Sequence, residues 1–244
     1  MKISIDPNKT IMGVNAAQCA SEQLHQAIAA RGQANLILAT GASQFEMLAS
    51  LVKQDVDWSK VNVFHLDEYI GLPITHPASF RKYLKERFED QIDGLRKFHY
   101  VDGEVDPQSE CQRLGMLIER LPIDVACIGI GENGHLAFND PPADFDSEEP
   151  YIIVDLDKAC RQQQVGEGWF ASLTDVPRQA ISMSIRQIMK SKAIVCTVPD
   201  ARKAEAVQRT VNGSVTNQVP ASILQTHTQC WLFLDEPAAA KLKI

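Results

Sequence analysis

The chain has 244 residues, of which 45% are hydrophobic and 23% charged, an ordinary composition for a folded globular protein. Its net charge is −7 and no cluster of Lys and Arg stands out, which argues against a nucleic-acid partner because binding phosphate backbones needs a basic patch. No run is long and apolar enough for a membrane helix or signal peptide, and the six cysteines form no C-x-x-C pair, so we expect a cytoplasmic protein with reduced thiols and no metal site.

Five apolar runs of strand length are predicted to be strands buried on both faces, as in a parallel sheet. They cover residues 34–40, 60–66, 124–130, 192–198 and 229–235. Helical patterns alternate with them at residues 16–32, 43–54, 77–91, 109–121 and 200–213. This alternation, without repeats or a linker, predicts an α/β fold with a mainly parallel sheet in a single domain over residues 1–244. Ligands of such folds bind beyond the carboxyl ends of the strands, so the residues after each run are the candidates for a site.

The first run leads into a turn of small residues, Thr40-Gly41-Ala42-Ser43, ahead of an expected helix. A helix start offers backbone N–H groups and the positive end of a dipole, and the two hydroxyls add donors. The turn therefore fits a phosphate-binding loop, although it lacks the spacing and the GK[ST] ending of a Walker loop. It fits a simple tight turn with Ser43 as the helix N-cap equally well.

Two acids, Asp67 and Glu68, follow the run at 60–66. Acids at the end of a buried strand are costly unless they are paired or functional. A carboxylate there could act as a general base on a carbon-bound proton. The alternative, which an isolated pair of acids favours slightly, is a cap of a turn or helix.

The stretch GIGENGHLAFNDPP, residues 129–142, follows the run at 124–130. Its glycines, beginning with Gly129, match the letters of a dinucleotide motif, but that motif normally follows the first strand of a domain, so we reject this interpretation. His135 with Asp140 resembles a histidine oriented by a carboxylate, which favours proton transfer. A structural histidine in a turn is the alternative, and the lack of clustered partners argues against a metal site.

Lys203 lies in the first turn of the helix expected after the run at 192–198. A cation at that place opposes the helix dipole, which is easier to understand if the lysine meets an anion. A lysine exposed to solvent is the alternative, and it is the commoner case for a lysine taken alone.

Together these residues resemble the glucosamine-6-phosphate deaminase (isomerase) family. The likeness rests on T-G-[GA]-[ST] at residues 40–43, D-E-Y-x-G-L-P with H-P-x-S-[YF] at 67–80, N-G-H-[IL]-[AG]-F-N-[ED]-P at 133–141, V-P with A-[IL]-[ST] at 176–182, K-A at 203–204 and D-E-P at 235–237. It extends from residue 34 to the C-terminal region, and the second and third motifs are long and specific. The resemblance implies a Rossmann-like three-layer fold and an enzyme that converts glucosamine 6-phosphate and water to fructose 6-phosphate and ammonia without a cofactor.

The resemblance also implies roles for individual residues. Asp67 would carry a proton from C2 to C1 of the sugar, and His135 would open the ring by moving a proton between O1 and O5. Asp140 would orient His135, and Asn133 stands where many members have aspartate, so that Asp140 would be the only ionic partner of the histidine. The substrate and its 6-phosphate would be held by Thr40, Gly41, Ala42, Ser43, Glu68, Gly129 and Lys203.

The sequence departs from the family pattern in two places. Members commonly carry a phosphate-binding arginine shortly before the V-P segment, where residues 167–170 read Glu-Gly-Trp-Phe, and we hypothesise that Arg161 or a shifted contact replaces it. Allosteric members carry basic residues shortly after the N-[ED]-P motif, whereas residues 147–150 read Ser-Glu-Glu-Pro. We therefore expect no activation by N-acetylglucosamine 6-phosphate, because an acidic stretch would repel a phosphosugar.

Three alternatives compete with this interpretation. A 6-phosphogluconolactonase has a related fold, but its D-E-R and D-G-H-T-A-S-L-F-P motifs differ from the sequence at Tyr69 and after His135. A non-catalytic phosphosugar-binding regulator would carry a helix-turn-helix module, for which the segment before residue 34 is too short. The same chemistry on galactosamine 6-phosphate stays open, and Asn133 and the missing arginine add weight to it. The expected partner is a small phosphosugar, with no nucleic acid and no membrane, and the family contains both monomers and hexamers, so a homo-oligomer stays open.

Overall fold

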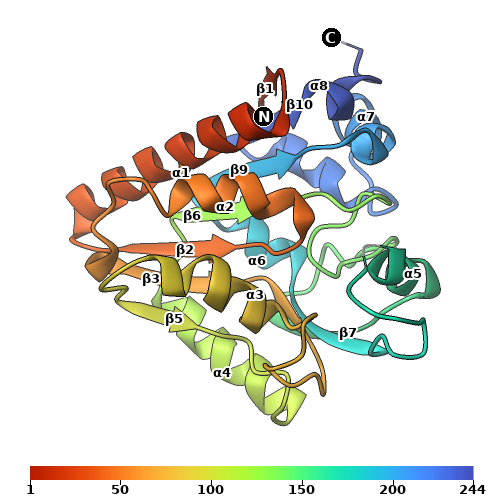
Figure 1. The fold of residues 1–244 in the computed structure, drawn as a ribbon, viewed down its shortest axis with the longest axis horizontal. Helices are drawn as coiled ribbons and strands as arrows, with labels where there is room; N and C mark the ends of the chain where they lie inside the picture. The colour runs from red at the N-terminus through yellow and green to blue at the C-terminus, as the bar shows by residue number, and fades with distance from the viewer. Residues whose placement is uncertain (167, 244) are drawn as a thin grey trace.

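Seven parallel strands form the central sheet of the computed structural model, which describes residues 1–166 and 168–243 (Figure 1). The strand order is β1-β10-β9-β6-β2-β3-β5. The five predicted runs are confirmed as β2 (Ala34–Leu38), β3 (Val61–His65), β6 (Val125–Ile128), β9 (Ala193–Val198) and β10 (Cys230–Asp235). All residues of β2, β3, β6 and β9 are buried, as their unbroken apolar runs predict. In this central sheet the pattern missed two strands, β1 (Lys2–Asp6) at one edge and β5 (Lys97–His99) at the other.

Helices cover both faces of this sheet and make the three expected layers (Figure 1). One core lies under α1 (Lys9–Arg31), α2 (Phe45–Leu51) and α3 (Phe80–Arg87). The other lies under α4 (Pro107–Arg120), α6 (Ile185–Met189), α7 (Ala204–Asn212) and α8 (Glu236–Ala239). Successive side chains of a strand serve opposite cores: in β2, Leu36 and Leu38 face the first and Ile37 the second. The expected mainly parallel α/β architecture is therefore confirmed.

Several helix ends differ from the predicted ranges because capping side chains set them. Helix α1 begins at Lys9 rather than residue 16, since the side chain of Asn8 accepts hydrogen bonds from the N–H groups of Thr10 and Ile11. It ends at Gly32, whose φ of 75° is the left-handed conformation that glycine adopts readily. Helix α3 begins only after Ser79, which caps it through the N–H of Lys82.

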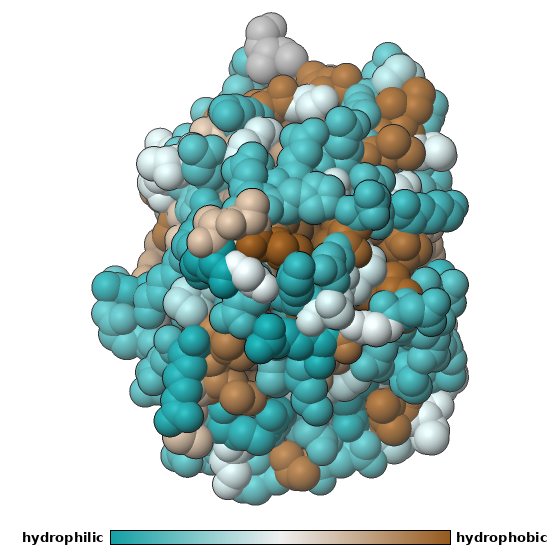
Figure 2. Space-filling model, turned by 90° about the vertical axis from the view of Figure 1, so that its left-hand side faces the viewer, coloured by the Kyte–Doolittle hydropathy of each residue, from teal (hydrophilic) through white to brown (hydrophobic). Residues whose placement is uncertain are grey.

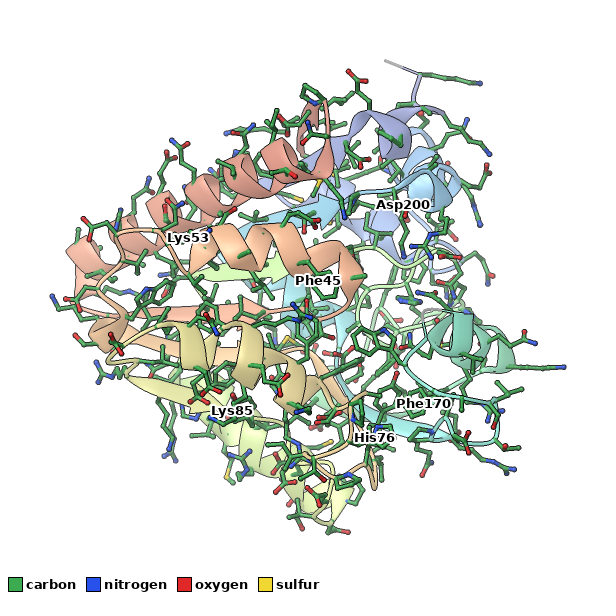
Figure 3. All side chains as sticks on the ribbon, in the orientation of Figure 1. Phe45, Lys53, His76, Lys85, Phe170 and Asp200 are labelled. Carbon is green, nitrogen blue, oxygen red and sulfur yellow. The ribbon has the colours of Figure 1, made fainter. Side chains whose placement is uncertain are left out.

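A second, antiparallel sheet lies beyond the carboxyl edge of the first, with strand order β4-β8-β7. Its strands are β4 (Asp67–Tyr69), β7 (Tyr151–Asp155) and β8 (Gln179–Met183), none of which the sequence pattern predicted. Helix α5 (Lys158–Gly166) lies in the connection between β7 and β8. It packs on this sheet through a small hydrophobic core that is separate from the other two. In that core Phe170 stacks on His76 with ring centroids 5.4 Å apart (Figure 3). The second sheet thus fixes a helix beside the end of the first sheet.

The neighbouring strands β2 and β6 are parallel, but the order in which the following strands are added to the sheet reverses between them. From β2 the chain proceeds outward through β3 to β5, and from β6 it proceeds the other way through β9 to β10. The loops after β2 and β6 therefore diverge and leave a crevice between them, which is the usual ligand site of such folds.

The face of the molecule shown in Figure 2 is mainly hydrophilic. On the face shown in Figure 2, apolar residues form small patches separated by hydrophilic ones. Within the described residues, no helix combines the length and the apolar character that crossing a membrane requires.

Candidate active site

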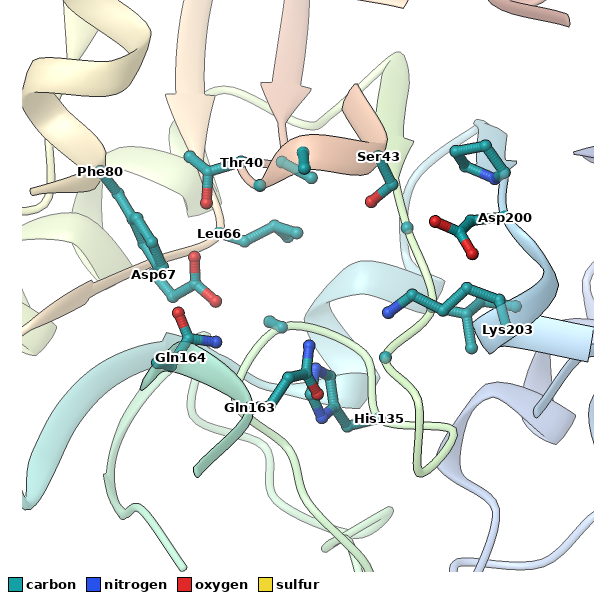
Figure 4. A pocket seen from close by; sticks show the side chains of 18 of the residues that line it. Thr40, Ser43, Leu66, Asp67, Phe80, His135, Gln163, Gln164, Asp200 and Lys203 are labelled. Atoms are coloured by element: carbon teal, nitrogen blue, oxygen red, sulfur yellow. The ribbon is translucent and has the colours of Figure 1, made fainter. Parts of the chain in front are cut away.

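A cavity of about 280 Å³ opens at the crevice between the two loops (Figure 4). Eight predicted site residues line it: Thr40, Gly41, Ala42, Ser43, Asp67, Gly129, His135 and Lys203. The structure therefore brings together residues that follow four separate strands, as the parallel sheet requires. Four other predicted residues lie outside the lining: Glu68, Asn133, Asp140 and Arg161.

One end of the cavity, which we call the phosphate end after the role that the sequence predicts for it, is made by the Thr40–Ser43 loop, Gly129 and Lys203. Gly41 has a φ of 94°, which favours glycine, and its carbonyl accepts a hydrogen bond from the Tyr83 hydroxyl at 2.8 Å. Ser43 lies inside the short 3₁₀ turn Ala42–Gln44 rather than at its N-cap, so the alternative of Ser43 as a helix cap is wrong. Its hydroxyl points into the cavity (Figure 4).

Gln44, which the sequence gave no reason to select, clamps this loop to the sheet. Its buried side-chain amide accepts a hydrogen bond from the hydroxyl of Thr197 in β9 at 3.0 Å. A Cβ atom at Gly129 would come within 2.9 Å of the Gln44 amide nitrogen. Glycine at 129 therefore lets the loop after β6 approach the loop after β2 closely enough to share a ligand.

Lys203 is buried, with 7% of its surface exposed, and its ammonium group points into the cavity (Figure 4). A cation that is buried and faces the ligand space favours an anion-binding role over that of a solvent-exposed lysine. Asp200, three residues earlier, has a φ of 88°, rare for a residue other than glycine, and its N–H is held by the Asp235 carboxylate at 3.0 Å. Two further cations, Lys9 and Arg202, line the cavity and were not predicted.

The other end, which we call the proton-transfer end, contains Asp67, His135 and Asp140. Asp67 is buried in β4, where it pairs in register with Ser182 of β8. Burial, and secondly the nearby charge of Glu68, raise the pKa of Asp67 well above its ordinary value. A carboxylate whose pKa is raised from the acid range towards neutrality is a stronger base, as proton abstraction from carbon needs.

Glu68 does not reach the cavity, so its predicted substrate contact is corrected. Successive residues of a strand point to opposite sides, and Glu68 therefore faces away from the side that Asp67 faces. Its carboxylate accepts hydrogen bonds from the Ser79 hydroxyl at 2.8 Å and from the Arg81 N–H at 2.9 Å. Glu68 thus ties the start of α3 to β4, and it supports Asp67 without touching the ligand space.

His135 and Asp140 are joined as the sequence suggests. The Nδ1 atom of His135 lies 2.9 Å from Asp140 Oδ1. Although burial alone would raise it, hydrogen bonds from His135 and Asn133 hold the pKa of Asp140 below its ordinary value. An ionised Asp140 accepts a hydrogen bond from Nδ1–H of His135. This fixes the proton on Nδ1 and leaves the other ring nitrogen, Nε2, to exchange protons with a ligand.

Asn133 uses both ends of its amide to hold this pair. Its nitrogen donates to Asp140 Oδ1 at 2.9 Å, and its oxygen accepts the backbone N–H of His135 at 3.0 Å. The His135 ring also lies against Gly131, where a Cβ would come within 2.3 Å of Nε2. Asn133 therefore orients the two groups without adding a second charge beside the histidine.

Arg161 is not brought to the cavity. It belongs to α5, and its guanidinium donates to the carbonyl of Leu173 at 3.4 Å, away from the lining. The hypothesis that it supplies the missing phosphate contact is therefore not supported by its position. Helix α5 instead lines the cavity with Gln163 and Gln164, followed by Trp169. No motif in the sequence marks these three residues, and the helix that presents Gln163 and Gln164 was not predicted.

Within the described part of the chain, no cluster of three or more His, Cys, Asp or Glu side chains is arranged to hold a metal ion. At the proton-transfer end, Asp140 and His135 are engaged with each other, and Asp140 also accepts a hydrogen bond from the Asn133 amide. The site presents acid–base groups and anion-binding groups.

The family model described as glucosamine-6-phosphate isomerases/6-phosphogluconolactonase matches residues 7–232. The chain belongs to this family. It is 35% identical to a glucosamine-6-phosphate deaminase of Streptococcus pneumoniae (strain Hungary19A-6) over 243 residues, which cover 100% of each chain. It is 37% identical over 205 residues to a glucosamine-6-phosphate deaminase of Exiguobacterium sibiricum, covering 84% of this chain and 80% of the relative.

Solved structures agree with the family assignment. A monomeric glucosamine-6-phosphate deaminase superposes with a TM-score of 0.89 at 28% identity, covering 99% of this chain and 100% of that one. A putative 6-phosphogluconolactonase from Neisseria gonorrhoeae superposes with a TM-score of 0.77 at 18% identity, covering 97% and 100%. At that identity the second likeness concerns the fold alone.

Proposed function

We propose that this chain is a glucosamine-6-phosphate deaminase, which converts glucosamine 6-phosphate and water to fructose 6-phosphate and ammonia. The observation that carries the proposal is the division of one cavity into a phosphate end and a proton-transfer end. The match at 35% identity over the whole length of a relative with this name favours the same reaction. The cavity holds the groups that such a reaction needs: an anchor for an anion, a base and a proton shuttle.

The reaction starts with opening of the sugar ring. His135 accepts the proton of the O1 hydroxyl at Nε2 and returns a proton to the ring oxygen O5 as the C1–O5 bond breaks. Asp140 stabilises the charged imidazole during this exchange, because its carboxylate lies 2.9 Å from Nδ1. The product of this step is the open-chain aldehyde, whose C2 proton is acidic because it lies beside a carbonyl.

Asp67 then carries a proton between neighbouring carbons. Its carboxylate removes the proton from C2, and the electron pair forms a C1–C2 double bond, which gives an enolamine. The protonated Asp67 then returns the proton to C1, one N–H proton of the amine passes to O1, and the C2–N bond becomes double, which gives an imine with a hydroxyl on C1. Water adds to that imine and ammonia leaves, which gives the ketone. The raised pKa of Asp67 suits a group that must both accept and return a proton.

The phosphate end supplies binding energy far from the reacting carbons. Lys203 contributes a positive charge, and the loop contributes the hydroxyls of Thr40 and Ser43. Anchoring the phosphate there would hold C1 and C2 against Asp67 and His135, which reduces the entropy cost of reaching the transition state.

Measurement of ammonia release across a panel of amino-sugar 6-phosphates tests this proposal. We expect ammonia and fructose 6-phosphate from glucosamine 6-phosphate, and ammonia release about 10³-fold slower from the D67N variant. Ammonia only from galactosamine 6-phosphate would keep the mechanism and change the substrate. Hydrolysis of 6-phosphogluconolactone without ammonia release from any amino sugar would overturn the proposal in favour of a lactonase.

A further inference from the structure

Gln164 occupies the proton-transfer end of the cavity, although no family motif includes it. It comes from α5 and is buried, with 7% of its surface exposed. Figure 4 shows its amide nitrogen pointing towards the middle of the cavity, beside the carboxylate of Asp67. A buried amide facing a ligand space is costly unless the ligand completes its hydrogen bonds.

Tyr69 sets the orientation of this amide. Its hydroxyl donates to the Gln164 side-chain oxygen at 2.9 Å, so the oxygen is committed to the protein. The Tyr69 ring is fully buried and is held by Phe80, Phe138 and Phe170, with centroid separations of 5.0, 5.2 and 5.4 Å. The nitrogen is consequently turned towards the cavity as a hydrogen-bond donor.

The same short strand places both the base and the tyrosine. Asp67 and Tyr69 are two residues apart in β4, so their side chains leave the strand on the same side. Tyr69 itself is outside the cavity lining, whereas Asp67 and Gln164 are part of it. The strand therefore fixes the position of the Asp67 carboxylate directly and that of the Gln164 amide through one hydrogen bond.

We propose that Gln164 is a substrate-binding residue that donates its amide N–H to the C1–C3 part of the phosphosugar, and that Tyr69 is the residue that positions it. This inference rests on the proposed function, which places C2 at Asp67 and the phosphate at Lys203. An amide N–H can bind a hydroxyl, a carbonyl or an unprotonated amine, but not an ammonium group, which has no acceptor. Gln164 would therefore contact a hydroxyl, the carbonyl or the unprotonated amine of this part of the sugar.

Four variants test the proposal: Q164L, Y69F, the Y69F/Q164L double variant, and Q162L as a control. Gln162 is exposed on the same helix and is absent from the cavity lining, so Q162L makes the same substitution without touching the ligand space. Y69F keeps the aromatic packing and removes only the hydroxyl. The measurements are kcat/KM for glucosamine 6-phosphate, the dissociation constants of glucosamine 6-phosphate and of inorganic phosphate by calorimetry, and the melting temperature.

We expect Q164L and Y69F each to lower kcat/KM and to weaken glucosamine 6-phosphate binding by about three- to tenfold, the effect of one hydrogen bond between neutral groups. Binding of inorganic phosphate should stay unchanged in both, because it occupies the other end of the cavity. The double variant should lose no more than Q164L alone, since Tyr69 acts through Gln164. Q162L should match the parent in every measurement.

The inference is overturned if Q164L binds glucosamine 6-phosphate within twofold of the parent. It is also overturned if the losses of Y69F and Q164L multiply in the double variant, or if inorganic phosphate binding weakens in parallel, since both results indicate a general structural effect. Failure of the proposed function looks different: the parent would bind the phosphosugar without releasing ammonia, and the effect of Q164L on the dissociation constants would still decide the role of Gln164.

Discussion

The two ends of the cavity are built in different ways. The phosphate end consists of strand-to-helix loops of the parallel sheet, in which backbone conformation at Gly41 and close approach at Gly129 matter most. The proton-transfer end consists of the buried Asp67 and the half-buried His135 and Asp140; the pKa of Asp67 lies well above its ordinary value and that of Asp140 below it. The difference suggests that binding and chemistry can be changed separately, with KM responding to one end and kcat to the other.

The largest effect is expected from D67N, which removes the base and keeps its size. We expect kcat for ammonia release to fall by about 10³-fold, within the range found for loss of a general base, with KM nearly unchanged. E68Q is the matched control: its carboxylate serves Ser79 and Arg81, so it should lower the melting temperature and leave most of kcat. Equal losses of kcat in both variants would show that the two acids do not have separate roles.

G131A tests the position of His135. An added Cβ would lie 2.3 Å from Nε2, so the ring must move away from its place. We expect kcat to fall by about 10²-fold, the lower part of the range for acid–base catalysis. G115A in α4 is the control, because its Cβ would meet only Pro150 at an ordinary 3.7 Å. A fully active G131A enzyme would rule out the observed ring position as the working one.

K203A and R161A compare the two cations proposed for the phosphate. Loss of a charged hydrogen bond should raise KM about 10- to 100-fold in K203A, with little change in kcat. R161A should leave KM within about twofold of the parent, because the guanidinium faces Leu173 rather than the cavity. Steady-state kinetics on one substrate decides between them, and a comparable rise of KM in R161A would restore the role that the sequence suggested.

The raised pKa of Asp67 predicts that D67N stabilises the fold although it lowers the activity. The neutral carboxyl is favoured in the fold, so its contribution to stability is full below the ordinary pKa of 3.8 and is lost as pH rises through the raised pKa. D67N avoids this loss and should melt higher than the parent at neutral pH, by about 2–4 °C for each kcal/mol gained. Thermal unfolding at several pH values should show the difference shrinking in acid; a constant difference would contradict this cause.

The last prediction is that N-acetylglucosamine 6-phosphate has no effect on the reaction rate. The acidic stretch at residues 147–150 predicts that N-acetylglucosamine 6-phosphate does not activate the enzyme. In the structure Glu148 pairs with Arg186 at 2.8 Å, so this stretch is joined to α6. Rate curves with and without the compound should overlap, and conversion of a sigmoidal curve to a hyperbolic one would refute the prediction.

The sequence by itself was enough for the central strands and for eight of the residues that line the cavity. Unbroken apolar runs mark strands buried on both faces, and the carboxyl ends of parallel strands meet at one edge, so Thr40, Asp67, His135 and Lys203 could be selected from their places after such runs. The pairing of His135 with Asp140 could be predicted because it is local.

Only the tertiary structure decided which way each side chain points and which residues distant in the sequence become its neighbours. It turned Glu68 away from the cavity, gave both ends of the Asn133 amide a partner, and left Arg161 outside the lining. It also brought Gln164 to Asp67 through the small antiparallel sheet, none of whose strands the sequence pattern predicted. A sequence pattern reports which residues are buried, but it does not report which buried groups face one another.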